Sequence, residues 1–246
     1  MIFLAVVLAA SPAETLTAAC EKDVASACTN LGLLYETGDG VTKDLTKAQT
    51  LYEKSCAARD SMGCNNLSTL LAADPKNLVR VISLLEHACT LGAGTACGNL
   101  GGRYLLGAGV AIDTKKARTL LERGCELRGA DACHNLGVAW EQGLFGRADF
   151  PKAAKLYRTG CDLGGMKACV NLGMALENGR GVKVDYVEAT RLYERACNAK
   201  IPIACNNFGN NLRSGTGVKA DTKRGIELIK GACAAGSPEA CANLVD

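Results

Sequence analysis

The sequence predicts an all-α fold, a superhelix (solenoid) of α/α-hairpin repeats with one disulfide in each repeat. Three observations predict it. The chain of 246 residues contains 14 cysteines, which fall into pairs of constant spacing. The pairs recur at a nearly constant interval. Between the pairs, apolar residues follow the period of an α-helix on two successive segments. A sequence that repeats every roughly 20–50 residues is typical of a solenoid, in which each repeat packs only on its neighbours.

The cysteine pairs define the repeat. Seven residues separate the two cysteines of every pair, and no cysteine is left over. Successive pairs lie 36 residues apart, except for one interval of 33 residues between Cys56 and Cys89, which marks a three-residue deletion. The pairs are Cys20 with Cys28, Cys56 with Cys64, Cys89 with Cys97, Cys125 with Cys133, Cys161 with Cys169, Cys197 with Cys205, and Cys233 with Cys241.

The first helix of each repeat is expected to begin at the second cysteine of a pair. If that cysteine is position 1, apolar or small residues occupy positions 1, 4, 5 and 8, as in Cys28, Leu31, Gly32 and Tyr35. This spacing places them on one helix face. Glycine inside a helix costs about 1 kcal/mol relative to alanine. Its recurrence at position 5 therefore predicts a close approach to another helix.

A loop of the form Gly-x-Gly-Val follows the first helix in most repeats, and an aspartate comes after it. An aspartate here is a natural N-cap, because its carboxylate accepts from the free amides of the next helix. The second helix then carries an apolar stripe of helical period, as in Ala48, Leu51, Tyr52 and Cys56. The aspartates are Asp44, Asp113, Asp149, Asp185 and Asp221.

We expect one repeat array over residues 14–246, with half-repeats at both ends. The second hairpin is shortened, and Ala72-Ala73-Asp74-Pro75 replaces its glycine loop. Residues 1–13 contain an apolar run that ends in Ser11-Pro12-Ala13, which has the form of a signal-peptidase site; a stray apolar helix is the alternative. The six full hairpins are expected at residues 28–56, 64–89, 97–125, 133–161, 169–197 and 205–233.

The cysteines of each pair flank the connection between repeats, where helix breakers such as Gly164-Gly165 and Pro202 stand. In one continuous helix their sulfurs would lie about 12 Å apart and could not bond, whereas a hairpin brings them together. The constant spacing therefore selects nearest-neighbour disulfides. Each closes a loop of about nine residues and contributes roughly 2–3 kcal/mol. Fourteen paired cysteines favour an oxidising compartment, so we expect a secreted or periplasmic protein.

Metal binding is the alternative role for the cysteines. A structural zinc ion needs four ligands, and neighbouring pairs in such an array are a whole hairpin, about 10 Å, apart. The two histidines, His87 and His134, do not recur from repeat to repeat, and no Cys-x-x-Cys occurs. We therefore expect no metal site and no other cofactor, and we expect both histidines to be surface or edge residues rather than ligands.

The repeat motif resembles the Sel1-like repeat family over about residues 20–246. The paired cysteines resemble more specifically the secreted Helicobacter cysteine-rich proteins, in which such pairs form disulfides across the hairpin. The resemblance implies a right-handed superhelix, similar to that of TPR proteins, which binds a protein or peptide on its concave face. The matching residues of the first repeat are Asn30-Leu31-Gly32, Tyr35, Gly38-Asp39-Gly40-Val41, Asp44 and Lys47-Ala48.

Several proteins of that bacterial group are named β-lactamases or penicillin-binding proteins, so a hydrolase is the alternative function. A serine enzyme of this type needs Ser-x-x-Lys, Ser-Asp-Asn and Lys-Thr-Gly, none of which occurs here. Two histidines are too few for the zinc type, and paired cysteines offer no thiolate nucleophile. The sequence therefore predicts no catalytic residue.

Asparagine occupies position 3 of the first helix in all seven copies. At 100° per residue, position 3 lies about 150° from the centre of the apolar stripe. Stacked repeats would align these amides as an asparagine ladder that could bind an extended peptide backbone. Alternatively, each asparagine bonds to a neighbouring helix or loop, which explains its recurrence equally well. The ladder consists of Asn30, Asn66, Asn99, Asn135, Asn171, Asn207 and Asn243.

Charge indicates the kind of partner. With 28 basic and 25 acidic residues and a formal net charge of +3, the chain lacks the basic surface that nucleic-acid binding requires. The apolar run at the start is too short to span a bilayer. We therefore expect a monomeric, non-catalytic scaffold that binds a protein or peptide, without nucleic acid and without stable membrane insertion.

Overall fold

A computed structural model describes residues 11–244 of the chain. In this part the chain forms α-helices and one short 3-10 helix, η1, with no β-strand. This confirms the predicted all-α fold of hairpin repeats with one disulfide per repeat. The elements are α1 (Pro12–Glu21), α2 (Ala25–Thr37), α3 (Leu45–Ala57), α4 (Ser61–Leu71), η1 (Pro75–Asn77), α5 (Leu78–Thr90), α6 (Gly94–Leu106), α7 (Thr114–Glu126), α8 (Ala130–Glu141), α9 (Phe150–Asp162), α10 (Met166–Asn178), α11 (Tyr186–Asn198), α12 (Pro202–Ser214), α13 (Thr222–Ala234) and α14 (Pro238–Ala242).

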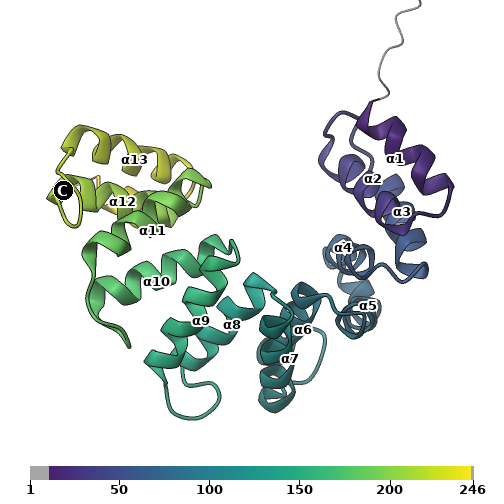
Figure 1. The fold of residues 1–246 in the computed structure, drawn as a ribbon, viewed down its shortest axis with the longest axis horizontal. Helices are drawn as coiled ribbons and strands as arrows, with labels where there is room; N and C mark the ends of the chain where they lie inside the picture. Colours follow the sequence, from purple (N-terminus) through teal and green to yellow (C-terminus); the bar gives the residue numbers. More distant parts are fainter. Residues whose placement is uncertain (1–10, 245–246) are drawn as a thin grey trace, which may run out of the picture. The chain divides into compact units, whose positions relative to one another are not determined.

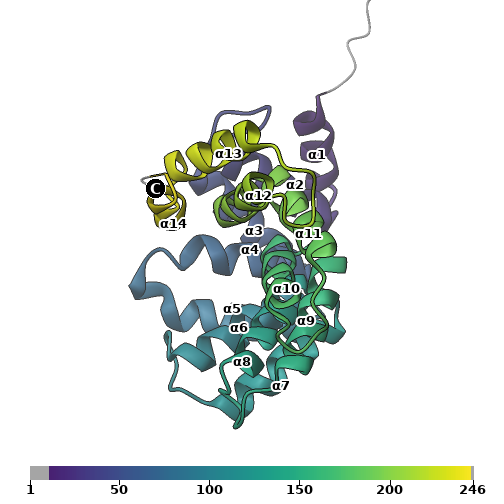
Figure 2. The same cartoon turned by 90° about the vertical axis from the view of Figure 1, so that its left-hand side faces the viewer.

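The chain divides into two compact units, residues 1–96 and 97–246. In the first unit, α1 packs on α2, and the pairs α2/α3 and α4/α5 form hairpins (Figure 1). In the second unit, the hairpins are α8/α9, α10/α11 and α12/α13, and each packs on the next. Figure 2 shows α14 beside α12 and α13 at the C-terminal end of this unit. None of the described helices is long and apolar enough to cross a membrane.

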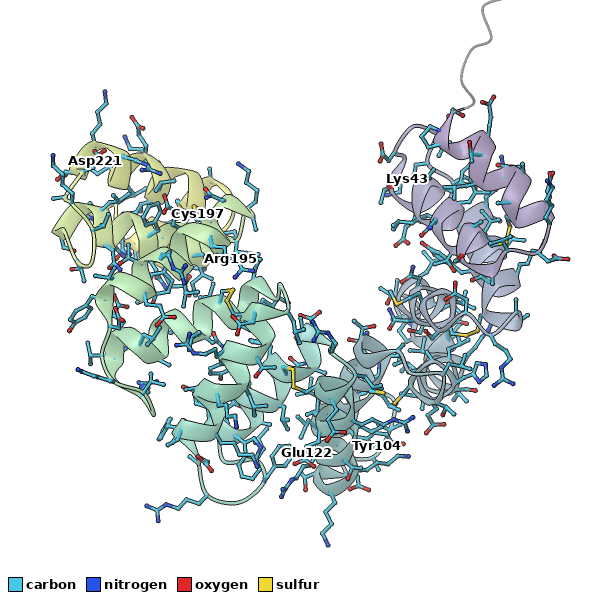
Figure 3. The ribbon with its side chains drawn as sticks, in the orientation of Figure 1. Lys43, Tyr104, Glu122, Arg195, Cys197 and Asp221 are labelled. Atoms are coloured by element: carbon cyan, nitrogen blue, oxygen red, sulfur yellow. A yellow bond between two sulfur atoms is a disulfide. The ribbon has the colours of Figure 1, made fainter. Side chains whose placement is uncertain are left out.

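Caps define the ends of the helices as the sequence predicts. The carboxylate of Asp44 accepts from the amides of Thr46 and Lys47 at the start of α3. The equivalent aspartates cap α7, α9, α11 and α13, and Figure 3 shows one of them, Asp221, beside the start of α13. Gly38 ends α2 in the left-handed conformation, with φ of +82°. Of the predicted leader, residues 1–13, the first ten lie outside the described residues.

In the first, fourth and fifth repeats, the helix glycine at position 5 accommodates a tyrosine ring of the second helix. A Cβ atom on Gly137 would lie 2.6 Å from Cε1 of Tyr157, and the same distance separates the equivalent atoms of Gly173 and Tyr193. Tyr157 and Tyr193 are almost completely buried. The predicted close approach is therefore confirmed, and the large group that fills the space is a tyrosine ring.

The aromatic residues at position 8 are less buried than a core stripe implies. Tyr35, Tyr104 and Trp140 are half-buried, and a lysine ammonium from the first turn of the following helix lies over each ring. The Lys116 Nζ atom, for example, is 4.3 Å from the ring centroid of Tyr104, which Figure 3 labels. The structure thus corrects the position of these rings, because position 8 lies where the hairpin opens toward its loop.

Disulfides close the turns between repeats. Six of them join cysteines eight positions apart, with Cα–Cα distances of 4.5–4.7 Å. Cys89 and Cys97 are also disulfide-bonded, and no cysteine of the described part is free. The six pairs are Cys20 with Cys28, Cys56 with Cys64, Cys125 with Cys133, Cys161 with Cys169, Cys197 with Cys205, and Cys233 with Cys241.

The first helix of each repeat begins about one turn earlier than the sequence analysis places it. Helix α8 starts at Ala130, ahead of Cys133, and α14 starts at Pro238, ahead of Cys241. The expected start at the second cysteine is therefore wrong. The physical reason is a shorter connection than the breakers imply: in α14 the Ser237 hydroxyl already caps the helix by accepting from the amide of Ala240. Each second cysteine thus lies inside the first turn of its helix.

A tight turn makes this early start possible. The residue three positions after the first cysteine has a positive φ in every repeat, which reverses the chain within a few residues. Each disulfide consequently joins the last turn of one helix to the first turn of the next. The residues at this position are Asp23, Arg59, Gly92, Arg128, Gly164, Lys200 and Gly236.

Candidate functional site

The asparagine ladder lies outside the hydrophobic core. Asn30 and Asn99 are exposed, and the other five asparagines are half-buried. Each of the first six stands early in a first helix, from α2 to α12, and Asn243 directly follows α14. The helical period therefore places the side chains on the face opposite the apolar stripe.

Three ladder residues lie beside a tyrosine of the preceding hairpin. The hydroxyl groups of Tyr52, Tyr157 and Tyr193 donate to carboxylate oxygens at 2.6, 2.5 and 3.1 Å. The ladder asparagine of the next repeat acts on each hydroxyl as a hydrogen-bond donor does, by lowering the pKa of the tyrosine against the larger effects of burial and the glutamate. Because the hydroxyl proton points to the carboxylate, the asparagine amide must be the donor. The three sets are Glu36–Tyr52–Asn66, Glu141–Tyr157–Asn171 and Glu177–Tyr193–Asn207.

We call this arrangement the tyrosine latch. It joins both helices of one hairpin to the first helix of the next. Burial raises the pKa of each of the three tyrosines far above its ordinary value, and the hydrogen bond to the glutamate and the negative charge of that glutamate add to the effect. The tyrosines therefore remain neutral hydrogen-bond donors at any physiological pH.

A second set of contacts runs along the ladder itself. The residue at position 2 bridges two asparagines in the second unit. His134 has Nδ1 at 3.2 Å from Asn135 Oδ1 and Nε2 at 3.1 Å from Asn171 Nδ2. Asn206 donates to Asn207 Oδ1 at 3.3 Å and accepts from Asn243 Nδ2 at 2.8 Å. Much of the ladder's bonding capacity is thus satisfied within the protein.

Four ladder asparagines lie outside the latch, and Asn30 and Asn135 are two of them. The side chain of Asn30 is exposed. Asn135 follows a hairpin whose second helix carries Leu121 in place of the tyrosine, so its Nδ2 amide has no tyrosine acceptor. A Cβ atom on Gly102 would meet only this amide, at 3.9 Å. Gly102 therefore leaves space beside an available donor.

Apolar side chains border the ladder at position 6. Leu33 and Met174 are 46% and 38% exposed, respectively, and Val138 is half-buried. The other residues at this position are Thr69, Gly102 and Asn210. The face therefore combines a constant amide with a side chain that changes from repeat to repeat.

The cysteines and histidines show no open metal site or nucleophile in the described part of the chain. The group of metal-ligating type found there is Cys56, Cys64 and His87, whose ligand atoms lie within 4.8 Å of one another. Both sulfurs belong to a disulfide and so cannot act as thiolate ligands. His87 is exposed as expected, whereas His134 is half-buried within the ladder. A half-buried ring agrees with the expected surface or edge position, but the packing of His134 between two asparagines was not predicted.

Paired helices that repeat at a fixed interval and pack only on their neighbours define a helical-repeat protein. The chain belongs to the Sel1 repeat family, whose sequence profile matches residues 25–60, 94–128, 130–165, 167–200 and 202–237. The unmatched segment between the first two matches contains the shortened hairpin. Sel1 repeats commonly mediate protein interactions.

Several known proteins are similar to the chain in sequence or in fold. The chain is 33% identical over 104 residues to cytochrome c oxidase assembly factor 7 of Xenopus tropicalis, a match that covers 40% of this chain and 45% of the relative. The match thus spans less than half of that relative's length. The crystal structure of a Sel1 repeat protein from Oxalobacter formigenes has a TM-score of 0.78 at 24% identity and covers 91% of this chain and 94% of the other. Cysteine-rich protein B of Helicobacter pylori is 29% identical, with a TM-score of 0.44 over 53% of this chain and 94% of the other.

Proposed function

We propose that the chain is a non-catalytic scaffold that binds a protein or an extended peptide through the face of the asparagine ladder, in the periplasm or the extracellular space. The observation that carries the proposal is a constant row of amides outside the core, bordered by variable side chains. An amide offers a donor and an acceptor to a peptide backbone whatever its sequence. The variable neighbours supply selectivity.

The binding residues of the proposal are Asn30, Asn66, Asn99, Asn135, Asn171 and Asn207. Their roles differ. Asn30 and Asn135 offer amide donors that no tyrosine occupies, so we assign them the direct contacts. We assign a positioning role to the latched asparagines Asn66, Asn171 and Asn207, which hold neighbouring hairpins at the spacing that suits the bound peptide backbone.

The disulfide-bonded state of the cysteines supports the oxidising compartment of the proposal. All cysteines in the described part are disulfide-bonded, a state that persists in oxidising surroundings and is rare in the cytosol. We therefore place the protein in the periplasm or outside the cell. Titration of thiols in the unreduced, denatured protein is expected to find none, and several free thiols per chain would contradict this placement.

Peptide display tests the binding function. Random linear peptides are selected on the oxidised chain, and the Kd of each selected peptide is measured for the wild type and for three variants. Asn30→Ala and Asn135→Ala each remove a proposed contact in one unit, whereas Lys155→Ala changes an exposed residue of α9 away from the ladder.

A peptide that binds the ladder should lose about fivefold to tenfold in affinity with Asn30→Ala or Asn135→Ala, the effect of one net hydrogen bond of about 1 kcal/mol. Lys155→Ala should leave its Kd unchanged. Failure to select any peptide, or selected peptides that respond only to Lys155→Ala, would overturn the proposal.

A further inference from the structure

His134 bridges two ladder asparagines of the second unit, with hydrogen bonds to Asn135 on its own helix and to Asn171 on α10. The Asn171 amide also acts on the hydroxyl of Tyr157, which donates to Glu141. Together these five side chains form one polar chain. It thereby connects α8 and α9 of one hairpin with α10 of the next. The imidazole is the one member of this chain whose ordinary pKa, about 6.5, lies near neutrality.

The direction of each hydrogen bond to the imidazole follows from its partner atom. The Nδ2 group of Asn171, which can only donate, faces Nε2 of His134 at 3.1 Å, so that ring nitrogen must accept and carries no proton. Nδ1 then carries the proton and donates to Asn135 Oδ1 at 3.2 Å. The complete chain therefore requires a neutral imidazole.

Protonation of His134 would place an N–H group opposite the Nδ2 group of Asn171, donor against donor. Rotation of the Asn171 amide would present its oxygen to the imidazolium but would turn its Nδ2 group away, so that the amide no longer acts as a donor toward Tyr157. Either outcome removes one favourable contact between the two hairpins.

The surroundings of the ring oppose its positive charge on balance. Burial lowers the pKa of His134; the hydrogen bond to Asn135 and the carboxylate of Asp131 on α8 raise it, and the ammonium of Lys167 on α10 lowers it further. From α9, the ring of Tyr157 lies 6.0 Å away between centroids. The Glu141 carboxylate of α8 accepts from Tyr157.

The sixth repeat contains the same bridge without a titratable group. Asn206 occupies the position of His134 and joins Asn207 and Asn243 through its own amide. Asn65 occupies this position in the second repeat and donates to Asn66 Oδ1 at 3.5 Å. An amide is therefore able to form this bridge at every pH.

We propose that His134 makes the junction between hairpins α8/α9 and α10/α11 pH-sensitive, closed while the imidazole is neutral and opened by its protonation. The proposal does not depend on partner binding. Because the pKa in the folded chain is lowered, the stabilising contribution is complete above the unfolded value of about 6.5 and is lost as the pH falls through the lower folded value.

Thermal unfolding of the wild type and the His134→Asn variant at pH 7.5 and pH 5.5 tests this proposal. The variant has the amide that repeats 2 and 6 use, so it retains a bridging group. We expect the Tm of the wild type to fall by about 2 °C or more beyond that of the variant between the two values of pH. Equal pH dependence of the two proteins would overturn the proposal.

Nitrogen-15 NMR of the wild-type histidines provides a measurement that does not rely on a variant. For His134 at pH 7.5 we expect the tautomer protonated at Nδ1, and a titration midpoint below that of the same residue in the urea-unfolded chain. A ring protonated at Nε2, or a midpoint equal to or above the unfolded value, would overturn the proposal.

Discussion

Tyr157 on α9 donates its hydroxyl proton to Glu141 Oε2 on α8 at 2.5 Å. The Asn171 amide of the following hairpin acts on the same hydroxyl as a donor, since it lowers the pKa of Tyr157. Because a net hydrogen bond contributes about 1 kcal/mol, the asparagine stabilises the junction. The recurrence of this residue therefore has a structural cause in three repeats.

Substitution of a latched asparagine should destabilise the chain more than substitution of an exposed one. Asn171→Ala leaves Tyr157 and His134 without their donor, so we expect a loss of about 1–2 kcal/mol in the free energy of unfolding. Asn30→Ala removes an exposed side chain and should change the free energy of unfolding by less than about 0.5 kcal/mol. Urea unfolding at pH 7.5 measures the free energy of both variants, and equal losses would contradict the latch.

Alanine in place of the second glycine of the loop should cost more free energy of unfolding where a preceding repeat packs on that glycine. A Cβ atom on Gly217 would lie 2.0 Å from the carbonyl oxygen of Tyr186, whereas one on Gly40 would have nothing within 4 Å. Both glycines have a φ near the left-handed region, +66° and +69°. Alanine therefore costs each about 1–2 kcal/mol in backbone strain.

Gly217→Ala should cost about 1–3 kcal/mol more than Gly40→Ala, because it also forces the loop away from α11. Comparison of the urea midpoints of the two variants isolates this steric part. Identical midpoints would show that the loop of repeat 6 is not held against α11.

Glycine at the turn between repeats should stabilise the chain. Arg128 has a φ of +62°, and the equivalent Gly164 has a φ of +93° with nothing within 4 Å of a Cβ atom. We expect Arg128→Gly to raise the free energy of unfolding by about 0.5–1 kcal/mol, since relief of strain exceeds the entropy lost with glycine. The reverse change, Gly164→Arg, should lower the free energy of unfolding. A loss of stability in Arg128→Gly together with a gain in Gly164→Arg would refute this explanation.

Removal of one disulfide should lower the free energy of unfolding, because the sulfur atoms have a structural role and no binding or catalytic one. For the double variant Cys197→Ala with Cys205→Ala we expect a loss of about 2–3 kcal/mol, because the unfolded chain regains the freedom of a short loop. Differential scanning calorimetry of oxidised variant and wild type measures the change. An unchanged Tm would mean that this crosslink contributes nothing to the folded state.

The periodicity of the sequence predicted much of the fold because each signal is local. The Asp44 cap lies two and three residues from the amides it accepts, and Cys161 and Cys169 close a turn of constant length. Such contacts depend only on helix geometry. The two-unit division could not be predicted, because it depends on the packing of hairpins that have the same local pattern.

The tyrosine latch was missed because its members lie in three different helices. Tyr157 and Glu141 are 16 positions apart, and the asparagine comes from the next hairpin. A signal was nevertheless present: a tyrosine on a buried helix stripe needs a partner for its hydroxyl, and the constant asparagine supplied one. The contacts of His134 were missed for the same reason, since its partners Asn135 and Asn171 belong to different repeats.

A double-mutant cycle of Tyr157→Phe and Asn171→Ala tests the latch most directly. The phenylalanine ring retains the packing against Gly137 and removes only the hydroxyl group. From the free energies of unfolding of the wild type, both single variants and the double variant, we predict a coupling energy of about 1 kcal/mol between the two side chains. A coupling energy within about 0.3 kcal/mol of zero would contradict the latch, because distant and independent sites give that value.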